Sequence, residues 1–438
     1  MGFIRKYLSA DGLHEMVRKN LCKEKFPACV GSEYSWQDCL MSGVAIFGLK
    51  FPSLLQFEKS KVTDANIRRN LHNLYGVKNA PSDTCLRERL DQISPKQLRR
   101  PFKAIFSALQ RGKMLENYRY LDGHYIVSID GTGQYSSKSI HCDNCCEKHH
   151  RNGQTTYYHH MLGAVIVHPE HKVVIPIAPE PIIKGDGATK NDCERNASKR
   201  LLNDLRREHP HLKLLVVEDG LASNYPHLSL IDSLNMNYII GVKPGDHKYL
   251  FDWIKDLKHK SHIQENPDGI VHEFHYYSNV PLNEEHHQYR VNVLRYTEIK
   301  ANGKKQEFSW VTRLVLTKEN TYEVMRAGRS RWRIENETFN CLKNQGYNFN
   351  HNYGHGYKNL CSVMTMLMML VFLIDQVQQL CCKTYQKARN KVGIFSVLFF
   401  EICTLIKYAI WPNFNQLLYF IGEPQNRAPP EGTAWMTC

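Results

Sequence analysis

The stretch His124-Tyr-Ile-Val-Ser-Ile-Asp-Gly-Thr-Gly133 decides how the rest of the chain is interpreted. Most residues from Tyr125 to Ile129 are aromatic, β-branched or apolar, which is the composition of a short buried strand. We expect this strand to stop at Asp130, since the glycines that follow favour a turn. An aspartate in this position usually caps a turn, but open α/β folds also keep functional carboxylates at this edge of the sheet. Partner carboxylates elsewhere in the chain distinguish the two interpretations.

Strands and helices alternate in a recognisable order after this stretch. Strand-forming residues fill 125–129, 155–167 and 172–177, and the third run ends at Pro179. Apolar residues at helical spacing then predict a helix over 188–209. The remaining elements are a strand over 212–217, a helix over 226–234 and a strand over 238–242. This order predicts a ribonuclease-H-like α/β domain, in which the first and fourth strands lie side by side.

A second carboxylate follows the fourth strand. That strand, a continuous apolar run, stops at Glu218-Asp219-Gly220. Adjacent strands lie about 4.8 Å apart, so carboxylates at the ends of two neighbours can share a metal ion. We therefore pair Asp130 with Asp219, although the two are far apart in the sequence.

The chain divides into five segments by pattern. Residues 1–120 are expected to be a helical, DNA-binding N-terminal region, with helices over 40–50, 68–75, 85–93 and 95–117. The last of these helices carries a basic outer face that either is solvated or contacts DNA, formed by Lys96, Arg99, Arg100, Lys103, Arg111 and Lys113. The ribonuclease-H-like core is expected to cover 121–248 and 323–375, and a helical tail 376–438. Between its two parts, residues 249–322 form a mainly β insertion with strands over 272–277, 288–296 and 308–316 and no evident helix.

Composition narrows the class of protein. The 438 residues carry a formal charge of +14, which favours a polyanionic partner such as nucleic acid. The 14 cysteines are scattered, and the N-terminus lacks the apolar core of a signal peptide, so we expect a reduced, cytoplasmic protein. The longest uncharged apolar run, 360–374, is shorter than the ~20 residues that span a bilayer. It therefore predicts a buried helix and no membrane association.

A third candidate carboxylate lies in Arg329-Ser-Arg-Trp-Arg-Ile-Glu-Asn-Glu-Thr-Phe-Asn-Cys-Leu-Lys343. On a helix, Arg331, Glu335, Thr338 and Leu342 share one face, while Trp332, Phe339 and Cys341 serve packing. A glutamate on such a basic helix is usually a surface ion-pair partner. Trp332 has a second possible use, because an indole ring can also stack on a base.

These three segments together resemble bacterial insertion-sequence transposases of the DDE class, in the cut-and-paste group with a β insertion in the ribonuclease-H-like domain. Asp130-Gly-Thr resembles the motif of the first catalytic aspartate, and Val216-Val-Glu-Asp-Gly220 that of the second. Arg331-Trp-Arg-Ile-Glu335 resembles the Tyr-x-x-Arg-x-x-x-Glu-x6-Lys signature around the third carboxylate. The resemblance covers about 120–375.

Two positions depart from that signature. Gly328 stands where the tyrosine is expected, and Leu342 stands where the lysine is expected, with Lys343 one residue further on. Glu337 also lies four residues after an arginine, Arg333, so it is an alternative to Glu335. We prefer Glu335, because Trp-x-Ile-Glu matches the signature better.

The resemblance implies chemistry that suits these residue types. Three carboxylates can hold two Mg²⁺ or Mn²⁺ ions for phosphodiester hydrolysis and strand transfer. Arg331, Trp332, Arg333 and Lys343 are then candidate DNA contacts. The implied partners are double-stranded DNA, as terminal inverted repeats and target, and a second copy of the chain, since two ends must be paired. A nuclease without strand transfer and a non-catalytic DNA-binding regulator remain alternatives.

A second group of metal-binding residue types follows the first strand. It contains His141, Cys142, Cys145, Cys146, His149 and His150, with His159 and His160 beyond. Cys142, Cys145 and His149 have the spacing of zinc ligands. Only one Cys-x-x-Cys pair is present, however, so reduced cysteines in a β-turn remain the alternative to a structural zinc site.

Overall fold

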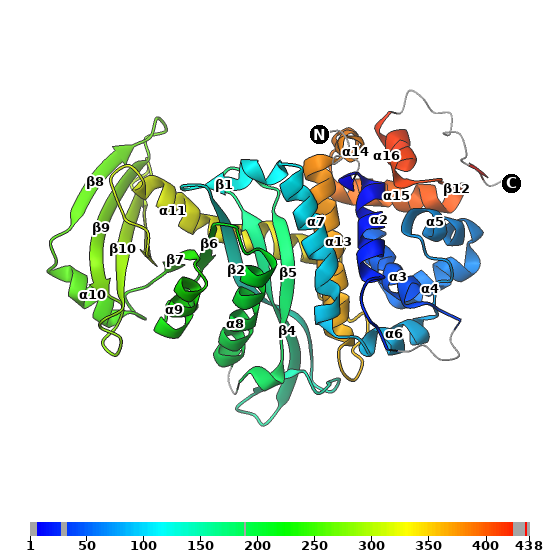
Figure 1. Ribbon diagram of the computed structural model, residues 1–438, viewed down its shortest axis with the longest axis horizontal. Helices are drawn as coiled ribbons and strands as arrows, with labels where there is room; N and C mark the ends of the chain where they lie inside the picture. The colour runs from blue at the N-terminus through cyan, green and yellow to red at the C-terminus, as the bar shows by residue number, and fades with distance from the viewer. Residues whose placement is uncertain (1–6, 28–32, 188–189, 424–433, 436–438) are drawn as a thin grey trace.

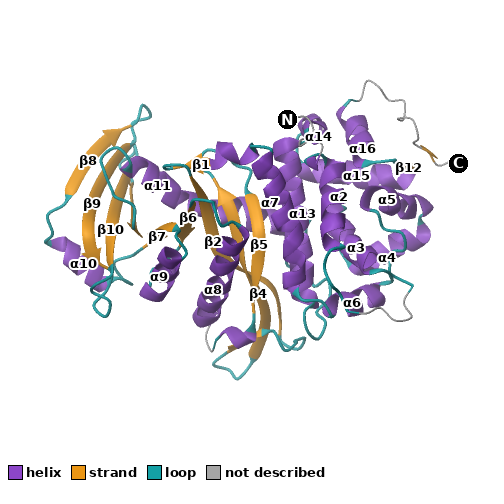
Figure 2. Ribbon diagram, viewed as in Figure 1, coloured by secondary structure: helices purple, strands orange, loops and turns teal. Residues whose placement is uncertain are grey.

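The computed structural model describes residues 7–27, 33–187, 190–423 and 434–435. A large mixed sheet forms one half of the elongated molecule, and a helical region forms the other half (Figures 1 and 2). Two long helices, α7 and α13, run side by side between the two halves. The structure therefore confirms a mixed α/β protein with helices at both ends of the sequence.

The N-terminal helices are well capped, which explains where they begin. The side chains of Ser9, Ser35, Ser53, Asp64 and Ser82 each accept a backbone N–H of the first helical turn. The helices are α2 (Ala10–Leu21), α3 (Trp36–Gly48), α4 (Leu54–Thr63), α5 (Ala65–Tyr75), α6 (Asp83–Asp91) and α7 (Arg99–Arg111). Short 3₁₀ turns, Pro95–Leu98 and Met114–Tyr118, flank α7. The predicted helices over 40–50, 68–75 and 85–93 are confirmed.

One residue of the basic outer face predicted for 95–117, Arg99, is not exposed. Arg99 is buried, and its Nε lies 2.7 Å from Glu208 Oε1 and 3.4 Å from Asp204 Oδ2. Arg100 is paired with Glu24. Arg99 is therefore part of the packing of α7 between the halves, whereas Lys96, Arg100, Lys103, Arg111 and Lys113 are exposed, as predicted.

The sheet contains eleven strands in the order β3-β4-β2-β6-β7-β11-β10-β9-β8, with β1 paired to β2 and β5 paired to β4. The strands are β1 (Arg119–Tyr120), β2 (His124–Ser137), β3 (Cys146–His149), β4 (Thr155–Val167), β5 (Ile175–Ile182), β6 (Leu214–Glu218), β7 (Asn237–Gly241), β8 (Lys260–Glu265), β9 (Val271–Pro281), β10 (Arg290–Ile299) and β11 (Lys305–Thr312). The first and fourth predicted strands, β2 and β6, are parallel neighbours. That adjacency was expected, and it is confirmed.

Two strands run further than predicted. β2 does not stop at Asp130 but continues to Ser137, because it stays paired with the long strand β4 beyond the end of β6. Gly131 and Gly133 therefore lie in extended chain and form no turn. β5 likewise continues past Pro179, at an irregularity in its pairing with β4. A proline is tolerated there because bulges and edge positions need no ladder hydrogen bond from it.

The helices between the strands match the alternating pattern. α8 (Lys190–Glu208) precedes β6, and α9 (Tyr225–Ser233) connects β6 to β7; short 3₁₀ turns cover Lys184–Asp186 and Gly220–Ala222. Both helices lie on the same face of the sheet (Figure 1). The inserted segment after β7 begins with a helix, α10 (Lys248–Lys255), before β8, and in the described residues no helix lies between the strands β9 and β11, where none was evident from the sequence.

The inserted strands continue the main sheet. β11 pairs antiparallel with β7 through Val311 and Ile240, and β10, β9 and β8 follow outward. The insertion is thus part of the same hydrogen-bonded sheet as β2 and β6, with β7 between it and β6.

The chain after β11 is helical. It contains α11 (Thr321–Arg329), a 3₁₀ turn (Ser330–Trp332), a π-helical turn (Glu335–Phe339), α12 (Asn340–Asn344), α13 (Leu360–Cys381), α14 (Lys383–Val392), α15 (Phe395–Tyr408) and α16 (Phe414–Gly422). Two short strands, β12 (Ala409–Ile410) and β13 (Ala434–Trp435), pair with each other.

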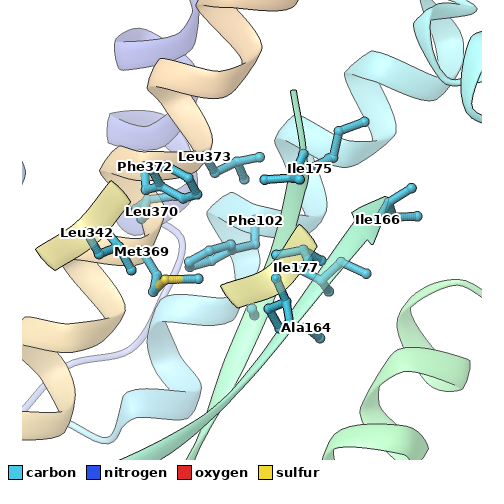
Figure 3. Packing of buried hydrophobic residues seen from close by; sticks show 14 of the residues in the cluster. Phe102, Ala164, Ile166, Ile175, Ile177, Leu342, Met369, Leu370, Phe372 and Leu373 are labelled. Atoms are coloured by element: carbon cyan, nitrogen blue, oxygen red, sulfur yellow. The ribbon is translucent and has the colours of Figure 1, made fainter. Parts of the chain in front are cut away.

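Helix α13 is the centre of the core. It is long and apolar enough to cross a membrane, but 94% of its most apolar stretch is buried inside the protein. The sequence predicted such a buried helix. Figure 3 shows its Met369, Leu370 and Phe372 gathered with Phe102 of α7 and Ile177 of β5. An ion pair of 2.8 Å between Asp375 of α13 and buried Lys50 adds a polar tie to the helical half.

Candidate active site

Asp130 and Asp219 occupy equivalent places on neighbouring strands. The last register pair between parallel strands β2 and β6 joins Ser128 to Val217. Each aspartate stands two residues beyond its member of that pair, where β6 ends and β2 continues. Parallel strands end at the same edge, so the two carboxylates are presented together.

The helical segment after α11 lies on the face of β2 that carries Asp130. Ser128 and Asp130 share this face because side chains alternate along a strand. Ser128 Oγ donates a hydrogen bond of 2.9 Å to the backbone oxygen of Arg331, and Arg331 Nη1 lies 3.1 Å from Asp130 Oδ2. A Cβ on Gly131, by contrast, would point at Glu194 on α8. Asp130 therefore faces the segment that contains Glu335.

A glycine on the next strand allows this segment to approach closely. Gly163 of β4 is the register partner of Asp130. A Cβ placed on it would meet Phe339 Cε1 at 2.9 Å and Ile334 Cδ1 at 3.3 Å. Phe339 and Ile334 are both buried, so they fix the π-helical turn against the sheet on the two sides of Glu335.

The three carboxylates interact electrostatically. The pKa of Asp130 is raised to about 6, mainly by burial and to a smaller extent by the negative charges of Asp219 and Glu335. The Arg331 guanidinium and the Gly131 backbone N–H act in the opposite direction. A carboxylate held near two others with one cation beside it is a fitting donor for a divalent metal ion, which would supply the missing positive charge.

The structure distinguishes the two acidic residues that end β6. Glu218 is buried, and its Oε2 lies 2.5 Å from Nε2 of His227, so this carboxylate is engaged inside the fold. Asp219 is exposed and uses one oxygen to accept the Leu221 N–H at 3.0 Å. Asp219 is therefore the residue free to act at the surface of the sheet edge.

Glu335 and Glu337 face different surroundings. The charge of Glu335 raises the pKa of Asp130, whereas Glu337 lies 3.8 Å from Arg333 Nη1. Arg333 in turn donates to the backbone oxygen of Pro169 at 2.7 Å, in a separate depression lined also by His272 and Arg329. Of the two glutamates, Glu335 is the one that approaches the aspartates.

The π-helical turn changes the register of the residues after Glu335. In an α-helix each residue advances about 100°, so the seventh residue returns to nearly the same face. A π turn contains one extra residue, which transfers that place to the eighth position, Lys343. In agreement with this shift by one residue, Lys343 is exposed and Leu342 is fully buried.

Trp332 does not serve packing, and that prediction is wrong. Its side chain is 50% exposed, and the Arg331 guanidinium lies 4.7 Å from its ring centroid. The 3₁₀ turn at Ser330–Trp332 rotates the indole away from the sheet face that the helical spacing had assigned to it. Arg331 and Trp332 thus form a basic and aromatic surface beside Asp130.

The cysteine group lies apart from the three carboxylates and differs from the prediction. Cys142 and Cys145 meet His159 and His355, with all four ligand atoms within 4.8 Å of one another. The predicted ligand His149 is wrong: its side chain is 74% exposed, and it bonds to Thr155. The β3–β4 hairpin explains the difference, because Cys146 pairs with Tyr158 and so brings His159 opposite Cys145. No local signal in the sequence points to His355.

The chain was compared with known proteins. Residues 122–373, more than half of the chain, match the family described as Transposase DDE domain, and the match includes Asp130, Asp219 and Glu335. No curated protein matches the chain. A similar solved structure is described as "Cryo-EM structure of piggyBac transposase synaptic complex with hairpin DNA (SNHP)". It is 9% identical, with a TM-score of 0.42, and the alignment covers 98% of this chain and 82% of that one. A likeness at this level carries no argument about the site.

Proposed function

The chain belongs to the transposase DDE domain family, and from this premise we propose that it cleaves DNA at the ends of its own element and joins those ends to target DNA. The observation that carries the proposal is the placement of Asp130 beside the end of β6, which carries Asp219, and against the segment that carries Glu335, to which Arg331 ties it at 3.1 Å. Three carboxylates from β2, from the end of β6 and from a later helix then act as one metal-binding group.

The strand order supports a ribonuclease-H-like core for this activity. Strands β5, β4, β2, β6 and β7 lie in that order, with β2, β6 and β7 mutually parallel and β4 antiparallel to β2. We assign residues 121–248 and 323–375 to this core and residues 249–322 to an insertion that extends its sheet. We assign 1–120 to a helical region that contacts DNA and 376–438 to a helical tail.

Asp130, Asp219 and Glu335 would hold two Mg²⁺ or Mn²⁺ ions. Ions so bound would increase the reactivity of an attacking water or 3′-hydroxyl and stabilise the leaving oxygen of the phosphodiester. The protein's own contribution is to fix the carboxylates. Arg331 orients Asp130 through its ion pair, and Ser128 holds the backbone of Arg331. Gly163 allows the glutamate to approach.

The surface beside the carboxylates suits a DNA backbone. The Arg331 guanidinium can bind a phosphate as well as Asp130. Trp332 offers an exposed ring on which a base can stack. Lys343 lies on the same side of the helical segment as Glu335. Arg333 is directed to Pro169 and Glu337 instead, so we propose for it a supporting role at the edge of this surface. The proposed partners are double-stranded terminal repeats, target DNA and a second copy of the chain.

The decisive experiment uses DNA carrying the inverted repeats that flank this reading frame, with Mg²⁺ or Mn²⁺. The wild-type protein is expected to release the element ends and join them to a second DNA. Asp130→Asn, Asp219→Asn and Glu335→Gln are each expected to lower cleavage by at least about a hundredfold while retaining DNA binding. Glu337→Gln, two residues away, is the matched control and should remain active.

Each other outcome has a defined meaning. Cleavage without joined products identifies a nuclease and overturns the strand-transfer part of the proposal. DNA binding with no cleavage in either metal identifies a regulator. Equal cleavage by Glu335→Gln and the wild type would remove the third carboxylate from the site.

A further inference from the structure

Four metal-binding side chains meet at a place distinct from the candidate active site. Cys142 Sγ and Cys145 Sγ are 3.9 Å apart, and each lies 3.4 Å from His159 Nε2. His355 Nε2 lies 3.3 Å from Cys145 Sγ. All four side chains are buried.

These distances can be compared with the edges of a zinc tetrahedron. Zn–S bonds of about 2.3 Å and Zn–N bonds of about 2.0–2.1 Å place two sulfurs about 3.8 Å apart and a sulfur and a nitrogen about 3.6 Å apart. The observed sulfur–sulfur distance of 3.9 Å and sulfur–nitrogen distances of 3.3 and 3.4 Å fall within about 0.3 Å of these values. Two thiolates and two imidazoles in this arrangement are a typical donor set of structural zinc sites.

The ligands come from three segments that the fold must hold together. Cys142 and Cys145 lie in the turn between β2 and β3, where the Cys145 N–H donates to the Cys142 oxygen at 3.1 Å. His159 lies on β4, and His355 lies in the loop that leads to α13. The turn and the loop are also joined by Asn144, which donates to the backbone oxygen of Lys358 at 2.7 Å.

The same loop is held from the helical half. Asp91 of α6 accepts the backbone N–H groups of Tyr357, Lys358, Asn359 and Leu360 at 2.8–3.2 Å, which caps the start of α13. The loop before α13 is thus anchored on one side by Asp91 and on the other side by the cysteines and His159.

We propose that Cys142, Cys145, His159 and His355 form a structural zinc site that fastens the loop before α13 to the β2–β4 side of the sheet. Four protein ligands complete the tetrahedron and leave no position for substrate, which distinguishes a structural site from a catalytic one. The site is independent of the proposed carboxylate chemistry. Its function is to fix the catalytic sheet relative to the helical half through α13.

A disulfide between the cysteines is the competing chemistry. It would require the sulfurs to approach to about 2.05 Å and would leave both imidazoles without a partner in a buried place. The observed separation of 3.9 Å, with a histidine nitrogen near each sulfur, fits a shared metal ion better.

The test is the metal content of the full-length protein purified without a histidine tag. We expect about one zinc ion per chain by mass spectrometry. Replacement by Co²⁺ should give the visible absorption of a tetrahedral cobalt–thiolate centre. Cys145→Ser and His355→Ala should lose the metal and lower the Tm, whereas the neighbouring controls Cys146→Ser and His149→Ala should retain it.

The readouts distinguish the proposal from its rivals. The proposal is overturned if the wild type contains no stoichiometric zinc and gives no cobalt spectrum. It is also overturned if Cys142 and Cys145 form a disulfide in freshly purified protein. Zinc loss in His149→Ala with retention in His355→Ala would replace the ligand set and also overturn it. If Cys145→Ser fails to fold, chelation of the wild type should lower the Tm and zinc should restore it.

Discussion

Arg331 Nη1 lies 3.1 Å from Asp130 Oδ2, and this pair joins the helix that carries Glu335 to the strand that carries the first carboxylate. The guanidinium stabilises the charged form of Asp130 and opposes the effects of burial and of Asp219 and Glu335 on its pKa. The contact is therefore both a structural tie and a control on the charge state of the site.

Replacing Arg331 should change the pH at which the site binds metal. In Arg331→Ala the pKa of Asp130 should rise above about 6, by about one unit, because the neighbouring cation is lost. The midpoint for Mn²⁺ binding should move to higher pH by the same amount, as measured by titration of the full-length protein. Arg331→Lys should restore most of the shift, and an unchanged midpoint in Arg331→Ala would contradict the pairing.

Asp130 should make the metal-free protein less stable as the pH rises. Its pKa is about 6 when folded against an ordinary 3.8, so the folded state binds more protons between these values. Stability relative to Asp130→Asn should fall from about pH 4 to about pH 6 and stay level above that range. At pH 7 without Mg²⁺ or Mn²⁺, the variant should melt about 1–3 °C above the wild type. Equal melting temperatures throughout would show that Asp130 has no raised pKa.

Gly163 should tolerate no side chain. In Gly163→Ala the new methyl group would meet Phe339 at 2.9 Å, so either the π-helical turn or the strand must move. We expect a loss of about 1–3 kcal/mol in the free energy of unfolding, together with reduced cleavage. Gly185→Ala, whose Cβ would meet nothing within 4 Å, is the control. Phe339→Leu in the Gly163→Ala background should recover part of both losses.

Lys343 should contact phosphate. Lys343→Ala is expected to weaken DNA binding uniformly across sequences and to reduce the slope of log affinity against log salt by about 1. Lys343→Arg should keep the slope. A slope unchanged by Lys343→Ala would place this residue outside the DNA interface, despite its phase on the helix.

Trp332 should matter for DNA and not for folding. Because its side chain is 50% exposed, Trp332→Ala should change the free energy of unfolding by no more than about 0.5 kcal/mol. Loss of a stacked base should weaken DNA binding by about 1–3 kcal/mol. The two quantities can be measured on the same preparation by denaturant unfolding and by fluorescence anisotropy. A large loss of stability would return Trp332 to the core.

Local patterns located most of the strands of the main sheet and the aspartates that follow their apolar runs. Apolar runs located β4 and β6, and the order of strands predicted that β2 and β6 are neighbours. What local patterns could not reveal is where a strand stops, because that depends on its partner. β2 continues through Asp130 because β4 remains paired with it. Gly131 and Gly133, which suggested a turn, instead allow the side chains of Glu194 and His160 to pack closely against the strand.

The remaining differences arise from irregular helix geometry and from long-range contacts. A 3₁₀ turn moved Trp332 to the surface, and a π turn moved the lysine position by one residue, and neither has a reliable signature in the sequence. His355 is separated from Cys145 by most of the catalytic domain, so only the folded chain brings them together. Arg99 was predicted to be exposed for the same reason, since its acidic partners lie on α8.

The pairing of β11 with β7 has a consequence for the order of synthesis. Asp130 and Asp219 precede the inserted strands in the sequence, and Glu335 follows them, so Glu335 is synthesised only after the insertion. Under the proposed roles, a nascent or prematurely terminated chain that lacks this last segment holds two carboxylates and cannot cut. Under those roles, the group of carboxylates is complete only in a chain that extends through the insertion to Glu335.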